Sequence, residues 1–233
     1  MTKGFFIAGS GTGVGKTYVA TTLLSGCAEL QRSATYMKPI ETGCERAEDG
    51  TMLTGSDTLD ALSFVCSKHK TDIDLHSPYR FHPACSPHLA ARMDGSEICI
   101  KKIVSVYEKL KKATSTEAIF VEGAGGILVP IGDRKYVADL MKALEIPAIL
   151  VVDAGLGTLN HTFMSLRILE HYDIPLAGVV INNAQNAKRD FIYEDNVKTI
   201  REHISPSPIL DIDCDEMSNE PLKEFCNEIL YGV

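Results

Sequence analysis

The chain has 233 residues, of which 45% are hydrophobic, and its formal net charge is −8. This length and apolar content predict one folded domain, residues 1–233, and argue against disorder. Acidic residues outnumber basic ones by 31 to 23, and the densest basic group, Lys109, Lys111 and Lys112, fits a solvated helix face, so we expect no nucleic-acid partner. No run of 18 apolar residues occurs, which argues against a membrane helix and a membrane partner.

The seven cysteines are odd in number and include no Cys-x-x-Cys pair. Neither a disulfide framework nor a zinc site is therefore predicted. This cysteine usage fits a reducing, cytoplasmic location best. An acidic chain that handles phosphate anions needs a local positive site, and we expect a divalent cation to contribute to it.

Short apolar runs alternate with longer segments of helical period, which is the pattern of βαβ units. The predicted fold class is α/β, with a mostly parallel sheet and helices on both faces. We expect strands at residues 4–8, 35–40, 118–122, 148–153, 176–181 and 208–212. We expect helices at residues 16–30 and 158–171, a possible helix near 58–65, and apolar residues at helical spacing around 100–110.

The segment Gly-Ser-Gly-Thr-Gly-Val-Gly-Lys-Thr, residues 9–17, follows the first predicted strand and opens the first helix. That placement is typical of a phosphate-binding loop, where backbone N–H groups and a helix N-terminus face the phosphates and a lysine reaches the terminal ones. The strict pattern G-x-x-x-x-G-K-[ST] is missed by one place, because Ser10 stands where it requires glycine. We interpret the loop as a lengthened variant; the alternative is a chance glycine-rich turn. Its expected nucleotide-binding residues are Gly13, Val14, Gly15, Lys16, Thr17 and Tyr18, with the Thr17 hydroxyl also a ligand of Mg²⁺.

Polar and glycine residues also follow the other predicted strands. The carboxyl ends of parallel strands meet at one edge of an open sheet, where ligands bind, so we expect these residues to lie close together. For Lys38 the alternative is a solvated surface lysine, and for Glu122 it is an exposed glutamate at a strand end. The residues are Lys38 and Thr42, then Glu122, Gly123, Ala124 and Gly125, then Asn160, and finally Asn182 and Asn183.

Two shorter motifs are open to different interpretations. Asp57, in Gly-Ser-Asp, fits a helix N-cap better than a metal ligand when only residue chemistry is considered. In Ser86-Pro87-His88, a turn is a simpler interpretation than a histidine acid. The glycines before Thr158 leave a helix N-terminus bare for an anion such as a carboxylate.

Taken together, these motifs resemble those of the dethiobiotin synthetase family. They occur in that family's order and at compatible spacing, from the first strand to about Asn183. The segments that carry the resemblance are residues 9–17, Lys38-Pro39-Ile40-Glu41-Thr42-Gly43, Ser56-Asp57, Ser86-Pro87-His88, Val121-Glu122-Gly123-Ala124-Gly125-Gly126 and Asn160-His161. The resemblance implies a P-loop NTPase-like fold and the ATP-dependent ring closure of 7,8-diaminopelargonate with CO₂ to dethiobiotin.

In that family a substrate amine takes up CO₂ as a carbamate, which accepts the γ-phosphoryl group before the second amine closes the ring. The resemblance implies catalytic roles for Lys16 and Lys38, ATP as co-substrate and Mg²⁺ as cofactor. It also implies a homodimer with the substrate site at the subunit interface. The implied ligands are Thr17, Asp57 and Glu122 for Mg²⁺, Lys38, Thr42 and Asn160 for the diamine substrate, and Asn182 and Asn183 for the nucleotide base.

The sequence departs from the family pattern at two places. Gly13 stands where the family often carries an acidic residue, and Asp211-Ile212-Asp213-Cys214 stands where it tends to show a Gly-x-Ile/Leu-Pro turn near the base. We therefore expect weak selectivity for the base. The alternative functions are a related amidoligase and a P-loop switch or partitioning ATPase.

Overall fold

The computed structural model describes residues 2–183, 189–213 and 219–232. In chain order its elements are β1 (Lys3–Gly9), α1 (Lys16–Glu29), β2 (Ala34–Met37), β3 (Ile40–Thr42), α2 (Ser56–Ser63), η1 (Ser67–His69), α3 (Ile73–His76), β4 (Tyr79–Phe81), α4 (Pro87–Met93), α5 (Ile100–Thr114), β5 (Ala118–Gly126), β6 (Pro130–Gly132), β7 (Lys135–Tyr136), α6 (Val137–Leu144), β8 (Ala148–Asp153), α7 (Thr158–His171), β9 (Leu176–Asn183), α8 (Phe191–Ile204), β10 (Ile209–Asp213) and α9 (Asn219–Tyr231).

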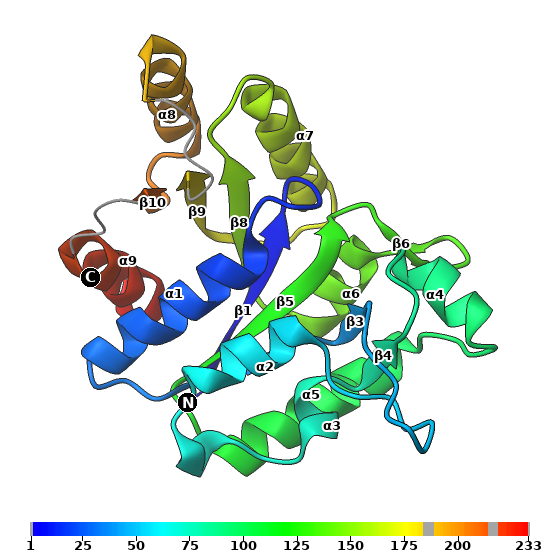
Figure 1. The fold of residues 1–233 in the computed structure, drawn as a ribbon. Helices are drawn as coiled ribbons and strands as arrows, with labels where there is room; N and C mark the ends of the chain where they lie inside the picture. Colours follow the sequence, from blue (N-terminus) through cyan, green and yellow to red (C-terminus); the bar gives the residue numbers. More distant parts are fainter. Residues whose placement is uncertain (1, 184–188, 214–218, 233) are drawn as a thin grey trace.

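The main sheet has six strands in the order β10-β9-β8-β1-β5-β2, and every neighbouring pair is parallel. Parallel neighbours need crossover connections, and here helices supply them (Figure 1). Strand β1 lies between β5 and β8, so the loop that follows it emerges at the middle of the sheet. This placement confirms the predicted mostly parallel α/β fold.

Helices cover both faces of this sheet, as predicted. Figure 1 shows α1, α2 and α9 on one face, where Leu23 of α1 and Phe225 of α9 belong to one buried apolar cluster. On the opposite face Ile103 of α5, Met141 of α6 and Leu169 of α7 belong to the other. Burial of both faces explains the near-continuous apolar runs of the central strands.

The second predicted strand, 35–40, is wrong at its carboxyl end. Strand β2 ends at Met37, and Ile40 begins β3, which pairs with β4 in a separate two-stranded sheet. Pro39 has no N–H for a sheet ladder, and the Lys38 N–H bonds instead to the carbonyl of His76 at 2.8 Å. The chain therefore leaves the main sheet at Lys38.

The remaining predicted strands are confirmed, with β5 and β9 extending beyond their expected ends to Gly126 and Asn183. The helix at 158–171 is confirmed at both ends, and α2 begins two residues before the expected 58. Helices α3, α4, α6, α8 and α9 were not predicted. Within the described ranges, no helix has the length and apolar character needed to cross a bilayer.

Candidate active site

The loop between β1 and α1 curls around the side chain of Lys16. Gly13 and Gly15 have φ of +80° and +85°, a backbone region in which glycine avoids a Cβ clash. Lys16 is 7% exposed, and its Nζ donates to the carbonyl of Gly11 at 3.3 Å. Helix α1 begins at Lys16 without a side-chain cap and without an acidic residue in its first turn, so its amino end is left for an anion.

Asn182, from the carboxyl end of β9, closes the loop from the other side. Its Nδ2 donates to the carbonyl of Val14 at 2.9 Å. A Cβ at Gly15 would lie 1.9 Å from that same Nδ2. Gly15 is therefore needed both for its backbone conformation and for this close approach.

The side chain of Lys38 lies between two carboxylates on different elements. Its Nζ donates to Glu122 Oε1 at 3.0 Å and also to the carboxylate of Asp57. Thr17 Oγ1 donates to the same Glu122 oxygen at 2.9 Å. Residues just after β2, in the middle of β5 and in the first turns of α1 and α2 therefore meet at one point.

Glu122 is held on its other oxygen by Tyr36, whose OH donates to Oε2 at 2.6 Å. Both residues are buried. Burial, followed by the charge of Glu122, raises the pKa of Tyr36 well above its ordinary value, so the phenol stays a donor. Glu122 consequently has fixed partners on both carboxylate oxygens.

The two lysines of the site have opposite pKa shifts. For Lys38, burial is the largest single influence and acts downward, but Glu122 and Asp57 together raise the pKa above its ordinary value. For Lys16, burial is again the largest influence and, with the charge of Lys38 added, lowers the pKa despite the attraction of Glu122. Lys38 is the more firmly charged of the two.

Most of the predicted site residues line one cavity of about 570 Å³. They come from the loop, β2, β3, α2 and β5, and the loop before α4 completes the wall. The predicted residues on this wall are Gly13, Gly15, Lys16, Thr17, Lys38, Thr42, Asp57, Glu122, Gly123, Ala124 and Gly125. Such a cavity, at the carboxyl edge of a parallel sheet, is where this fold class binds ligands.

The structure corrects two interpretations made from residue chemistry alone. Asp57 is not the cap of α2, because Gly55 holds that position and Asp57 lies in the first turn with its carboxylate on Lys38. Ser86-Pro87-His88 is not a simple turn, because Ser86 and Pro87 begin α4 and line the cavity. Residue chemistry alone did not indicate either position, whereas the family resemblance had implied that Asp57 belongs to the site.

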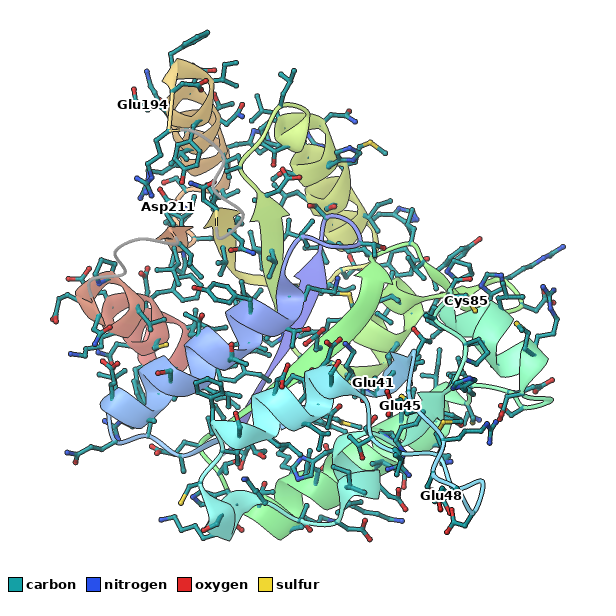
Figure 2. The ribbon with its side chains drawn as sticks, in the orientation of Figure 1. Glu41, Glu45, Glu48, Cys85, Glu194 and Asp211 are labelled. Carbon is teal, nitrogen blue, oxygen red and sulfur yellow. The ribbon has the colours of Figure 1, made fainter. Side chains whose placement is uncertain are left out.

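Five predicted residues lie outside the cavity lining: Val14 of the loop, Asn182, which bonds to it, and Tyr18, Asn160 and Asn183. Tyr18 is on α1 and 43% exposed. Asn160 lies in the first turn of α7, after the expected bare helix N-terminus at Thr158. Asn183 is buried at the end of β9. The cavity also includes a side chain that the sequence did not single out, Cys85, which Figure 2 labels near α4.

The donor set of this site fits Mg²⁺. Thr17, Asp57 and Glu122 supply one hydroxyl and two carboxylates, and Mg²⁺ is commonly held by one or two carboxylates together with substrate phosphates. Across the described part of the chain, no group of three or more His, Cys, Asp or Glu side chains is arranged to hold a metal. A cation at this site would therefore rely on the Thr17 hydroxyl and on the nucleotide's own oxygens.

A glycine loop around a buried lysine, at the central strand of a parallel sheet, defines the P-loop nucleotide-binding class. Solved structures agree on the fold: the hydrogenase maturation factor HypB from Archaeoglobus fulgidus aligns with a TM-score of 0.54 at 17% identity, covering 98% of this chain and 90% of its own. A ParA family ATPase from Chlorobium tepidum TLS aligns at 0.53 and 15% identity, covering 100% of this chain and 93% of its own.

Sequence comparison gives the family. The profile of a family described as AAA domain matches residues 3–215. The ATP-dependent dethiobiotin synthetase BioD of Fusobacterium nucleatum subsp. nucleatum is 39% identical over 199 residues, 85% of this chain and 85% of its own length. That of Thermodesulfovibrio yellowstonii is 33% identical over 246 residues and covers 100% of both chains. This chain belongs to the dethiobiotin synthetase family, as its motifs predicted.

Proposed function

We propose that this protein closes the ureido ring of dethiobiotin from 7,8-diaminopelargonate and CO₂, with ATP converted to ADP and phosphate. Membership of the family supports the reaction. The observation that carries it is the position of Lys38, which lines the same cavity as Lys16 and Thr17 and is held charged by two carboxylates. A charged lysine that lies outside the phosphate loop but lines the same cavity can bind an anionic acceptor of the phosphoryl group.

The proposed chemistry proceeds in three balanced steps. One substrate amine adds to CO₂ and loses a proton to solvent, which gives a carbamate. A carbamate oxygen then attacks the γ-phosphorus, ADP leaves, and a carbamic-phosphoric anhydride results. The second amine attacks the carbonyl carbon, phosphate leaves, a proton passes to solvent, and the five-membered ring is closed. No protein nucleophile is required.

The main obstacle in the second step is the approach of two anions. Lys16 and the amino end of α1 would hold the phosphates, and Lys38 would balance the carbamate and the transferring phosphoryl group. Thr17, Asp57 and Glu122 would hold Mg²⁺, which would supply further positive charge against the nucleotide's phosphates. Thr42, on the cavity wall beyond Lys38, would contact the diamine.

The nucleotide would extend from the loop towards β9. Asn182 and Asn183 would bind the base, and the contact of Asn182 with the loop backbone at the end of β9 supports this. Gly13, Val14 and Gly15 would offer their N–H groups to the phosphates, and Gly123, Ala124 and Gly125 form the facing wall without bulky side chains. Tyr18, in the first turn of α1, would contact the nucleotide beside the loop.

We further propose a cytoplasmic homodimer in which Asn160 of one subunit completes the substrate site of the other. Apolar side chains exposed near Asn160 support an interface there: Leu156 is 91% exposed and Met164 is 59% exposed. Sedimentation of the wild type and of Leu156→Asp tests it. A wild type that sediments as a monomer at assay concentrations would overturn the dimer.

The deciding experiment for the reaction is product mass together with phosphate release, in Mg²⁺-ATP and bicarbonate, with and without 7,8-diaminopelargonate. Dethiobiotin formed in step with phosphate supports the proposal. Phosphate release that ignores the diamine would favour a switch or partitioning ATPase instead. Formation of an amide product would favour an amidoligase.

A further inference from the structure

Glu41, two residues after the kink at Pro39, is a buried carboxylate with no role in the mechanism above. It is 2% exposed. Its Oε1 accepts the backbone N–H of Thr58 at 3.1 Å. Its Oε2 accepts the hydroxyl of Thr58 at 2.7 Å and that of Ser77 at 3.2 Å. Three donors from two other segments therefore converge on this one carboxylate.

The contacts of Glu41 fall on the first turn of α2. That helix begins at Ser56 after Gly55, and it has no side-chain cap of its own. A Cβ at position 55 would lie 2.4 Å from Glu41 Oε1, so only glycine leaves room for the carboxylate. Figure 2 shows Glu41 beside α2. A strand residue therefore performs the capping that the helix lacks, and its charge suits the amino end of a helix.

This capping affects the cavity, because the first turn of α2, which Glu41 caps, also carries Asp57. The carboxylate of Asp57 is 42% exposed and accepts a hydrogen bond from Lys38. Glu41 lies on the short segment between Lys38 and Thr42, both of which line the cavity. One carboxylate therefore ties the segment that carries the lysine to the helix turn that carries its partner.

We propose that Glu41 is a positioning residue, which sets the place of Asp57 relative to Lys38, Thr17 and Glu122 and thereby sets the affinity of the site for a divalent cation. The inference rests on the proposed function only for the identity of the cation site. Residues that orient a metal ligand typically change metal affinity by tenfold or more when they are lost.

The test uses electron paramagnetic resonance to measure Mn²⁺ binding to the full chain in the presence of a non-hydrolysable ATP analogue. Mn²⁺ serves as a paramagnetic replacement for Mg²⁺. The variants are Glu41→Gln, which keeps the size but removes the charge, and Thr58→Val, which removes only the hydroxyl contact. The control is Thr114→Val, which deletes a buried hydroxyl bonded to Leu110 on α5, remote from the cavity lining.

Glu41→Gln is expected to weaken Mn²⁺ binding by about tenfold and Thr58→Val by about threefold, while the analogue without metal binds as in wild type. Amide hydrogen exchange should rise in residues 56–63 and not in α1. Thr114→Val should leave both readouts unchanged even where it lowers the urea midpoint. Unchanged Mn²⁺ affinity in both Glu41→Gln and Thr58→Val, in folded protein, would overturn the proposal.

These readouts need no diamine. A protein that makes no dethiobiotin but loses Mn²⁺ affinity in Glu41→Gln would refute the proposed reaction and retain the role of Glu41. A protein that makes dethiobiotin and keeps Mn²⁺ affinity in both variants would do the opposite. If Glu41→Gln does not fold, Thr58→Val decides, since it retains the carboxylate and the backbone contact.

Discussion

The side chain of Lys38, the residue after β2, meets that of Glu122, in the middle of the neighbouring strand β5, at 3.0 Å, and both are buried. Because the two side chains are only 8% and 2% exposed, water cannot readily replace either partner when the other is removed. A pair of this kind is costly to break from one side, because the remaining charge stays desolvated. The same pair lies in the cavity with the phosphate loop, so stability and turnover depend on one contact.

Lys38→Met is expected to lower the free energy of unfolding by about 3 kcal/mol, because it leaves Glu122 buried without a cation. Turnover should fall by about a hundredfold or more, whereas ATP affinity should stay within about threefold. Urea unfolding, steady-state kinetics and calorimetry measure the three quantities. Lys142→Met, which breaks an exposed pair with Asp173, is the control and should leave all three unchanged. Turnover retained in Lys38→Met removes this residue from the catalytic group.

ATP binding is expected to take up protons at alkaline pH. Burial holds the pKa of Lys16 below its ordinary value of 10.5 in the free protein, and bound phosphates would raise it. ATP affinity should therefore fall as the pH rises through the depressed pKa. Calorimetry over a series of alkaline pH values, each in two buffers of different ionisation heat, measures the uptake. Lys16→Arg keeps its charge, so its affinity, although weaker, should be flat over the same range; a pH dependence equal to wild type would contradict this account.

Removal of one oxygen from Tyr36 should weaken the fold. The OH of Tyr36 donates to the buried Glu122 at 2.6 Å, so Tyr36→Phe is expected to cost about 2 kcal/mol of unfolding free energy. Tyr231→Phe is the matched control, because its OH donates to Glu117 at 3.1 Å at an exposed site. That variant should change the unfolding free energy by less than about 0.5 kcal/mol. Equal urea midpoints for the two variants would show that burial of the Glu122 contact does not matter.

The stability of the fold is expected to fall at mildly acidic pH because of His76. This side chain is fully buried, with Nδ1 2.6 Å from the carbonyl of Tyr36 and Nε2 accepting the N–H of Thr71 at 3.3 Å. Burial lowers its pKa below 6.5, so the unfolded chain binds the proton first. Stability from this group is complete above about pH 6.5 and is lost as the pH falls towards the depressed pKa. His76→Gln should flatten the dependence of the unfolding free energy on pH below about 6.5; an unchanged slope would assign it to another group.

Discrimination among nucleotides is expected to be weak. Asp211 and Ile212, on β10, occupy the segment where the family tends to show a proline turn near the base, and Cys214 lies outside the described residues. The carboxylate of Asp211 is engaged by the Tyr193 hydroxyl and, at 3.4 Å, by Arg189. Turnover with ATP, GTP and CTP should therefore differ by less than about tenfold. A selectivity equal to that of a relative with the proline turn would contradict this.

The sequence predicted the parallel core and the phosphate loop because both are encoded locally. Apolar runs mark the buried strands, and the glycines before Lys16 mark the loop. The predicted strand 35–40 runs through Pro39, whereas in the structure the chain changes sheet there. The strand that pairs with β3 is β4, and none of the predicted strands covers it.

The polar contacts around the cavity could not be predicted in the same way. Asp57 was interpreted as a cap because residue chemistry treats each helix alone, whereas α2 is capped by Glu41 from another element. Tyr36 offered one usable signal: residues 36 and 38 of an extended strand face the same side, so a tyrosine two residues before the site lysine can share its partner. For Glu41 the sequence contained no such signal, because its partners Thr58 and Ser77 are known only from the structure.

The central position of β1 also governs how the protein is made. Its pairing partners lie far along the chain: the hydroxyl of Thr2 bonds to Thr116, 114 residues away. At ordinary rates of translation, β1 leaves the ribosome on the order of ten seconds before β5 can pair with it. During that interval its apolar segment, Phe5-Phe6-Ile7, has neither of its neighbouring strands to pair with, so the nucleotide loop reaches its final place only after β5 and β8 have been made.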